Sequence, residues 1–153
     1  MTVRFLDVAV VDVDFGVDVS VVRPTNLYGC RIGDRTFIGP FVEIQKGAVI
    51  GKDCRIQSHA FICEMVTIGD ECFVGHGVVF INDDFKTGAP ARGKQALWRP
   101  TRIGDRVSIG SNVTILPVTV ATGCVIGAGS TVTRDLSVRG VYAGNPARLV
   151  REL

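Results

Sequence analysis

Large aliphatic side chains recur along this chain at every sixth position. The spacing runs from Ile32 through a series of isoleucines to Ile68 and continues to Phe80. It resumes at Ile103 and, after one step of five residues, ends at Val132. A period of six matches neither the 3.6-residue period of a helix nor the two-residue alternation of a strand in an ordinary sheet. The pattern therefore predicts a protein built from repeated hexads.

Two further positions of each hexad are regular. The residue after the aliphatic is often glycine, as at Gly33 and Gly39, and the fourth residue after it is small or β-branched, as at Thr36 and Ala48. A chain that turns a corner after each hexad explains both features, because the aliphatic and the small residue then point inward while glycine permits the backbone angles of the corner. Three strands make one triangular coil, which stacks on the next at about 4.8 Å, the spacing of paired strands. We therefore expect a single all-β domain over residues 1–153.

Three segments depart from the hexads. Residues 1–22 alternate with a period of two and predict strands or an irregular cap over the first coil. Residues 81–101 are too many for one hexad, so they must leave the coil as an excursion loop, and ordered loops on rigid scaffolds often carry function. Near the end of the chain, Asn145 and Pro146 fit the N-cap and the first position of a helix. The expected fold thus ends in a short C-terminal helix over residues 145–153.

The composition narrows the class of protein. Seventeen Lys and Arg residues against fifteen Asp and Glu residues give a net charge of +2, which argues against a protein that coats nucleic acid. Residues 107–133 carry no charge, but they are rich in Ser, Thr, Asn and Gly, so we expect no membrane insertion. Aspartates interrupt the apolar runs near the start, which excludes a secretory signal pattern, and we expect a cytoplasmic protein.

Residues eighteen positions apart should lie above one another in successive coils. Asp34, Lys52 and Asp70 then form a ladder of alternating charge. We interpret this ladder as a solvated, weakly stabilising face.

Four of the five cysteines, Cys30, Cys54, Cys72 and Cys124, occupy inward positions of their hexads. Cys54 and Cys72 are stacked neighbours, close enough in principle for a disulfide. We favour the interpretation that they are reduced and pack the core. Cys63 instead follows an inward isoleucine at an outer corner, and we assign it no chemistry.

The chain has two histidines, His59 and His76, and no CxxC pair or other cluster of metal ligands, so we expect no metal site. His76 falls at a corner, with Ser58 one coil below it and Ser111, across the excursion loop, one coil above. Ala128 comes next on the same edge. This alignment makes His76 a candidate proton acceptor, although an exposed turn residue would fit the same position.

A second set of polar residues lies at a different corner. Asn82 follows the inward Phe80 at the start of the excursion loop, and Glu64 lies one coil below it. The loop is basic, with Lys86, Arg92, Lys94 and Arg99. Such side chains suit a pyrophosphate or a carboxylate.

The hexad pattern over residues 26–153 resembles the hexapeptide-repeat superfamily of acyltransferases. This resemblance implies a left-handed parallel β-helix and a homotrimer that binds acetyl-CoA in grooves between neighbouring subunits. The segments 126–135 and 141–153 are similar to the coenzyme signature of those enzymes. The match implies that the amides of Ser111 and Ala128 hold the pantetheine arm. The residues it implies for the phosphates and the adenine are Thr133, Arg134 and Arg148.

More narrowly, residues 26–83 resemble acetyltransferases of nucleotide-linked amino sugars, including the UDP-2-acetamido-3-amino-2,3-dideoxyglucuronate and dTDP-3-amino-sugar N-acetyltransferases. The resemblance implies that Asn82 lies beside the acceptor amine and that the excursion loop, with Glu64 and Lys86, helps to bind substrate. The implied function is transfer of acetyl from acetyl-CoA to the amine of a UDP- or dTDP-linked sugar, a precursor of bacterial surface polysaccharide or O-antigen. His76 takes or relays the proton of the amine in this mechanism, and no acyl-enzyme is needed.

Two other functions remain open at this point. The same fold could acetylate another small acceptor, such as an antibiotic, a simple sugar or serine. A non-catalytic β-helix scaffold is a further alternative, although it leaves the basic loop and the sequence GNPAR at 144–148 without a purpose.

Overall fold

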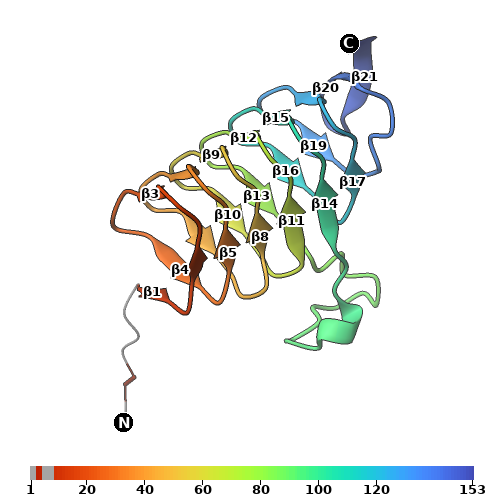
Figure 1. The fold of residues 1–153 in the computed structure, drawn as a ribbon. Helices are drawn as coiled ribbons and strands as arrows, with labels where there is room; N and C mark the ends of the chain where they lie inside the picture. The colour runs from red at the N-terminus through yellow and green to blue at the C-terminus, as the bar shows by residue number, and fades with distance from the viewer. Residues whose placement is uncertain (1–2, 5–8) are drawn as a thin grey trace.

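The computed structural model describes residues 3–4 and 9–153, and over these residues the chain winds as a β-helix with three faces (Figure 1). Short strands form three sheets, here called A, B and C, and successive strands of the coil enter the sheets in turn. All pairs between coils are parallel, and the arrangement is the left-handed parallel β-helix that the resemblance implied. The predicted fold class is confirmed.

Each sheet stacks one strand from successive coils, although the last coil reaches sheet B only through an isolated bridge between Val120 and Leu136. Sheet A contains, in order, β1 (Val10–Val11), β4 (Asn26–Tyr28), β7 (Glu43–Ile44), β10 (Phe61–Ile62), β13 (Val79–Phe80), β16 (Thr114–Ile115) and β19 (Thr131–Val132). Sheet B contains β2 (Asp14–Phe15), β5 (Arg31–Ile32), β8 (Val49–Ile50), β11 (Val66–Ile68), β14 (Thr101–Ile103) and β17 (Thr119–Val120). Sheet C contains β3 (Ser20–Val21), β6 (Phe37–Ile38), β9 (Arg55–Ile56), β12 (Phe73–Val74), β15 (Ser108–Ile109), β18 (Val125–Ile126), β20 (Gly140–Ala143) and β21 (Arg148–Glu152). We call the corners that join these sheets, in chain order, the A–B, B–C and C–A edges.

The coils are stacked in register. Phe37 on β6 pairs with Arg55 on β9, which pairs with Phe73 on β12, so the eighteen-residue spacing is kept. The inward aliphatics of the hexads are buried, with Ile62 and Ile109 at 0% exposure. Burial of one such side chain contributes roughly 1.5–3 kcal/mol, so this central column is the main source of stability.

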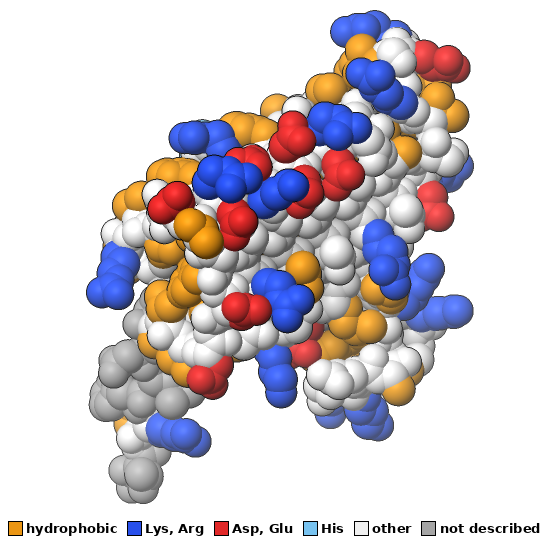
Figure 2. All heavy atoms as spheres, viewed as in Figure 1, with side chains coloured by type: hydrophobic (Ala, Val, Ile, Leu, Met, Phe, Trp, Pro, Cys, Tyr) orange, Lys and Arg blue, Asp and Glu red, His pale blue; other side chains and the backbone are white. Residues whose placement is uncertain are grey.

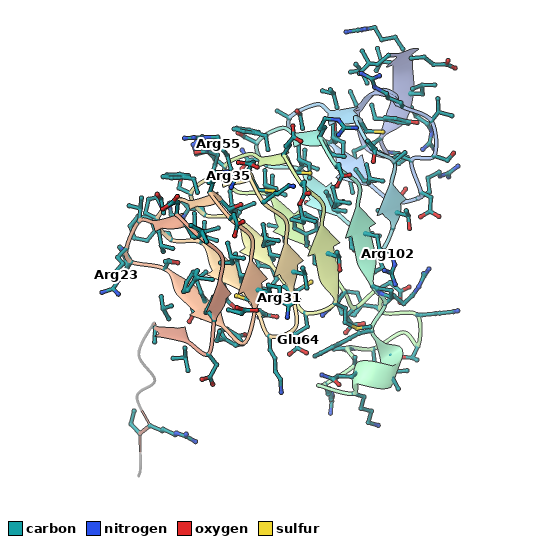
Figure 3. The ribbon with its side chains drawn as sticks, viewed as in Figure 1. Arg23, Arg31, Arg35, Arg55, Glu64 and Arg102 are labelled. Carbon is teal, nitrogen blue, oxygen red and sulfur yellow. The ribbon has the colours of Figure 1, made fainter. Side chains whose placement is uncertain are left out.

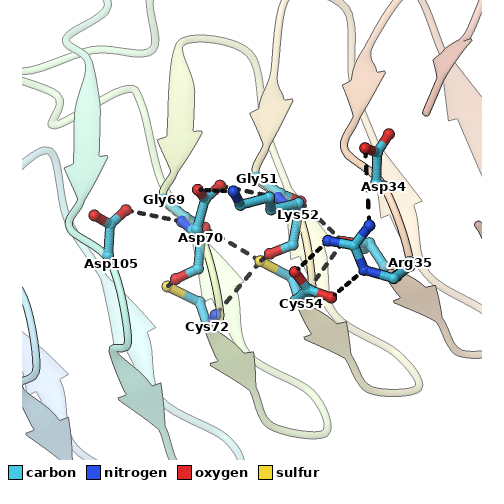
Figure 4. Close-up of polar contacts among 11 residues, drawn as sticks. Asp34, Arg35, Gly51, Lys52, Cys54, Gly69, Asp70, Cys72 and Asp105 are labelled. Atoms are coloured by element: carbon cyan, nitrogen blue, oxygen red, sulfur yellow. Dashed lines mark hydrogen bonds and ion pairs between the residues drawn. The ribbon is translucent and has the colours of Figure 1, made fainter. Parts of the chain in front are cut away.

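Aspartates line the B–C edge, where the predicted ladder is present (Figure 4). The Lys52 ammonium lies 3.7 Å from the Asp70 carboxylate, but both are exposed, so this ion pair adds little. The carboxylates also accept backbone hydrogen bonds from the coil below. The Lys52 N–H donates to Asp70 Oδ1 (3.0 Å), and the Asp70 N–H donates to Asp105 Oδ1 (2.9 Å).

The first coil comes from the N-terminal segment. β1, β2 and β3 pair in register with β4, β5 and β6, so the described part of residues 1–22 forms strands of the coil itself rather than an irregular cap over it. Residues 1–2 and 5–8 lie outside the described residues.

The predicted C-terminal helix is wrong. Residues 144–147 form a turn, and β21 then pairs antiparallel with β20. The last coil leaves one side of β20 without a further coil, and pairing with β21 satisfies the backbone groups of that side.

The excursion loop is confirmed. The chain leaves the prism after β13 and returns at β14, which pairs in register with β11 of the preceding coil (Figure 1). A short 3-10 helix, η1 (Gln95–Leu97), lies within the loop.

All five cysteines lie in the described part of the chain, where each is a buried free thiol. The Cys72 N–H donates to Cys54 Sγ (3.4 Å), and the Cys54 thiol donates to the Gly69 carbonyl (3.1 Å) (Figure 4). The interpretation of these residues as reduced core thiols is confirmed. Cys63 differs from the prediction, because it is 3% exposed rather than open at an outer corner, and burial raises its pKa to about 12.

The folded protein should react slowly with a disulfide reagent such as DTNB. Burial raises the pKa of Cys30 to about 11 and that of Cys63 to about 12, so little of the nucleophilic thiolate forms near neutral pH. Because all five thiols are buried, we expect every thiol to react at least about a hundredfold more slowly than in denaturant. If the folded protein released one equivalent of the coloured DTNB thiolate per chain, this expectation would be contradicted.

Candidate functional site

The C–A edge brings three predicted site residues into one column. His76, Ser111 and Ala128 occupy the same corner position in successive coils, with Ser58 one coil below. The Asn112 N–H donates to the His76 carbonyl (2.8 Å), which holds one corner directly above the other. The His76 ring is exposed, and its Nδ1 lies 3.5 Å from Ser111 Oγ. The imidazole is thus open to solvent beneath two coils that carry small side chains.

The backbone amides of this column are available to a ligand. No hydrogen bond among the described residues uses the amide of Ser111 or of Ala128. At the B–C edge, by contrast, carboxylates cap the amides of Val17, Lys52 and Asp70. The C–A edge therefore offers N–H donors that the fold itself leaves unused, and such donors suit the carbonyl groups of an extended arm.

Of the residues expected at the phosphates, one lies near this column. Arg148 begins β21, where it pairs with Ala143, and a side-chain carbon added at Gly127 would lie 3.2 Å from the Ala143 Cβ. Thr133 and Arg134 are exposed, but they follow β19 at the A–B edge. One chain therefore brings Arg148, but neither Thr133 nor Arg134, toward Ala128.

Asn82 and Glu64 hold the excursion loop in place. Asn82 lies above Glu64 at the A–B edge, as predicted, and its Nδ2 donates to the Glu64 carbonyl (3.2 Å). The Glu64 carboxylate accepts a hydrogen bond from Gln95 Nε2 on η1 (2.9 Å), so it reaches the loop from the coil below (Figure 3). The Asn82 carbonyl accepts from the Arg99 N–H (2.9 Å). Glu64 thus has a structural role that was not predicted from the sequence.

Two aspartates that were not singled out from the sequence order the rest of the loop. Asp83 Oδ2 accepts a hydrogen bond from the N–H of the buried Ala91 (2.7 Å), and Asp84 pairs with the Arg99 guanidinium (3.2 Å). Adjacent aspartates are typical of turns capped by side chains, so the signal was present. Lys86 lies with Asp84 and Arg99 at a cavity of about 280 Å³. Basic side chains surround the loop on the face drawn in Figure 2.

One chain does not bring His76 and Asn82 together. His76 precedes β13 at the C–A edge and Asn82 follows it at the A–B edge, so the width of sheet A separates them. A site that contains both residues needs the A–B edge of a second copy beside the C–A edge of the first.

Over residues 3–4 and 9–153, no three His, Cys, Asp or Glu side chains are grouped so that they could hold a metal ion. Within the same ranges, no helix is both long enough and apolar enough to cross a membrane.

Comparison with known proteins finds the hexapeptide repeat in two segments of the chain. Residues 29–64 match the bacterial transferase hexapeptide (six repeats) family, and residues 100–134 match the hexapeptide repeat of succinyl-transferase. Both matched segments lie in the stacked coils and flank the excursion loop. Two segments of the chain are thus similar to hexapeptide-repeat transferases.

A curated relative shares part of this sequence. The bifunctional protein GlmU of Dichelobacter nodosus (strain VCS1703A) is 40% identical over 107 residues, which cover 69% of this chain and 20% of GlmU. This chain therefore spans about a fifth of the length of that relative.

Solved structures show the same architecture. A mutant of AntD, an N-acyltransferase from Bacillus cereus, in complex with dTDP and coenzyme A, superposes with a TM-score of 0.77 at 20% identity, over 91% of this chain and 83% of AntD. The hexapeptide-repeat acetyltransferase VCA0836 from Vibrio cholerae O1 biovar eltor, in complex with acetyl-coenzyme A, gives a TM-score of 0.59 at 26% identity, over 84% of this chain and 70% of that protein.

Proposed function

We propose that this protein transfers an acetyl group from acetyl-CoA to the primary amine of a nucleotide-linked amino sugar. The observation that carries the proposal is the column at the C–A edge. There an exposed imidazole lies below two corners whose amides, those of Ser111 and Ala128, are unused by the fold. A thioester arm held by these amides would end beside His76.

The coils above His76 support the part of the proposal that concerns acetyl-CoA, the acetyl donor. The carbonyl and amide groups of a pantetheine arm need partners along an extended path, and the unused corner amides supply them at successive coils. Arg148, near the upper end of the edge, has a guanidinium that suits the 3′-phosphate. The likeness to VCA0836, which was solved with acetyl-coenzyme A, supports the same co-substrate here.

We further propose that the active form is a homotrimer. In this assembly the A–B edge of one copy lies beside the C–A edge of the next, so Asn82 of the first approaches His76 of the second. The same contact would bring Thr133, Arg134 and Lys86 toward the groove, where their positive or polar groups suit phosphates. Solution mass measurement tests the assembly.

The chemistry requires no covalent intermediate. The amine nitrogen forms a C–N bond to the thioester carbonyl carbon, and the C–S bond then breaks. The proton lost by nitrogen passes through His76 to the departing sulfur, while a backbone N–H stabilises the oxyanion of the tetrahedral intermediate. Holding both substrates in one groove supplies the orientation, which can account for several kcal/mol of the barrier.

An activity assay with different acceptors tests which class of molecule receives the acetyl group. Release of CoA from acetyl-CoA is measured with UDP- and dTDP-linked amino sugars, and in parallel with aminoglycoside antibiotics, simple sugars and serine. We expect turnover with a nucleotide-linked amino sugar and little with the other acceptors. Turnover with one of those acceptors alone would assign a different acetyltransferase activity, and absence of acetyl-CoA binding would favour a scaffold.

A further inference from the structure

The C–A edge changes character at His76. Above it, the left-handed corner positions hold Gly129 and the polar Asn112, beside Ala128. Below it, the equivalent positions hold His59 and Phe41, whose rings stack with centroids 4.9 Å apart and planes 17° apart. Both aromatic residues are exposed. The lower half of the edge is thus an aromatic surface, whereas the upper half is small and polar.

The fold does not require aromatic residues at these corners. Phe41 and His59 have φ values of 61° and 64°, in the left-handed region. Polar residues such as Arg35 and Asp53 adopt the same region at the B–C edge, so the position accepts many side chains. The next residue of the same column, Gly77, has a φ of 66° and adopts it freely. Phe41 is also 55% exposed, so its ring contributes little to the core. The left-handed φ is general to the corners of this coil, so it is the exposure of the stacked rings that points to a role in binding.

A cavity adjoins this aromatic pair. It has a volume of about 250 Å³, and its lining includes Pro24, Thr25, Asn26, Phe41 and Glu43. The Asn26 side-chain amide makes no hydrogen bond among the described residues, so it has both a donor and an acceptor to offer. A flat ring at one side and an unpaired amide nearby are the two elements that proteins use to hold a base.

We propose that Phe41, His59 and the adjoining cavity hold the pyrimidine base of the nucleotide-linked acceptor. The inference rests on the proposed function and adds where the acceptor lies. At the spacing of paired strands, the cavity lies two to three coils, or about 10–14 Å, below His76. An extended diphosphate can bridge that interval, passing the hydroxyl and the unused amide of Ser58. The two substrates then lie end to end along one edge, with CoA above His76 and the nucleotide below it.

Calorimetric titration of the intact protein with UDP, dTDP and CoA tests this placement. Phe41→Leu removes the π surface and keeps an apolar side chain, whereas Phe41→Trp keeps a π surface. Phe15→Leu is the matched control, because Phe15 is 40% exposed on β2 of sheet B, away from the C–A edge. We expect Phe41→Leu to weaken UDP and dTDP about tenfold and CoA not at all, while Phe41→Trp and the control bind like the wild type.

Other outcomes overturn the inference in distinguishable ways. Wild-type affinity of Phe41→Leu for UDP and dTDP, with CoA binding and turnover intact, removes the base site and leaves the proposed function standing. A loss confined to CoA would place the adenine at this pair instead. A changed solution mass in both Phe41 variants, with weak binding of all three probes, would assign the pair to a subunit contact. Failure of the wild type to bind any probe would remove the proposed function itself.

Asn26→Leu provides an independent readout if the Phe41 variants fold poorly. It removes the amide and retains the side-chain size, at a position that is only half-buried. We expect a several-fold loss of affinity for UDP and dTDP and unchanged affinity for CoA. Unchanged affinity for all three probes would contradict the site.

Discussion

Replacing His76 with alanine should lower kcat by about a hundredfold or more, because a positioned general base contributes about 10²–10⁴ in rate. The KM for acetyl-CoA should stay within about twofold, since the proposed contacts to the coenzyme arm come from backbone amides of other coils. Stability should change by less than about 0.5 kcal/mol, because the exposed ring has only a 3.5 Å contact to Ser111 Oγ. Steady-state kinetics with a saturating acceptor measure the effect.

Two further variants separate the roles that His76 could have. His76→Gln retains a hydrogen-bonding side chain but cannot carry a proton between substrates. A kcat as low as that of His76→Ala then identifies His76 as the proton acceptor. Recovery to the wild-type kcat identifies it as a hydrogen-bonding residue beside an amine that arrives neutral. His59→Ala is the matched control one coil below, and it should raise the KM of the nucleotide sugar while kcat at saturation is kept.

The coil was predictable because its signal is local and repeated. Each hexad carries its own inward aliphatic, such as Ile62. A shift of one residue in the register between coils would expose the whole column of these side chains. The same eighteen-residue rule that aligned His76 with Ser58 also places Phe41 below His59. That aromatic stack was therefore within reach of the sequence, but it becomes informative only when the structure shows that both rings are exposed.

The features that were predicted wrongly or missed depend on contacts between residues far apart in the sequence. Asn145 followed by proline satisfies the local rules for a helix start, yet the open side of β20 decides the outcome by pairing with β21. Local spacing also placed Cys63 at an outer corner, although it is buried in the folded chain. The contact between Glu64 and Gln95 spans 31 positions and needs the path of the excursion loop. No period in the sequence encodes such contacts.

Gly110→Ala should both destabilise the fold and weaken coenzyme binding. A Cβ at this position would lie 2.5 Å from the Ala128 nitrogen and 2.8 Å from the Ala128 Cα. These are backbone atoms that cannot rotate away, so the two coils must move apart. Overpacking of this kind costs about 1–3 kcal/mol of the free energy of unfolding. The displaced amide is the one proposed to hold the pantetheine arm, so we expect the KM for acetyl-CoA to rise about tenfold or more, since each 1.4 kcal/mol of lost binding is tenfold.

Gly127→Ala is the control for this effect, because it adds the same atom at the equivalent corner position one coil above. The closest contact of its Cβ would be the Ala143 Cβ, at 3.2 Å, which a small adjustment relieves. The free energy of unfolding, measured with denaturant, should therefore be clearly lower for Gly110→Ala than for Gly127→Ala. A rise in KM for acetyl-CoA in Gly110→Ala, with kcat at saturation largely kept, would link the Ala128 amide to coenzyme binding. Equal stability of the two variants with wild-type KM would mean that the coils tolerate the added carbon and that this amide does not contact the coenzyme.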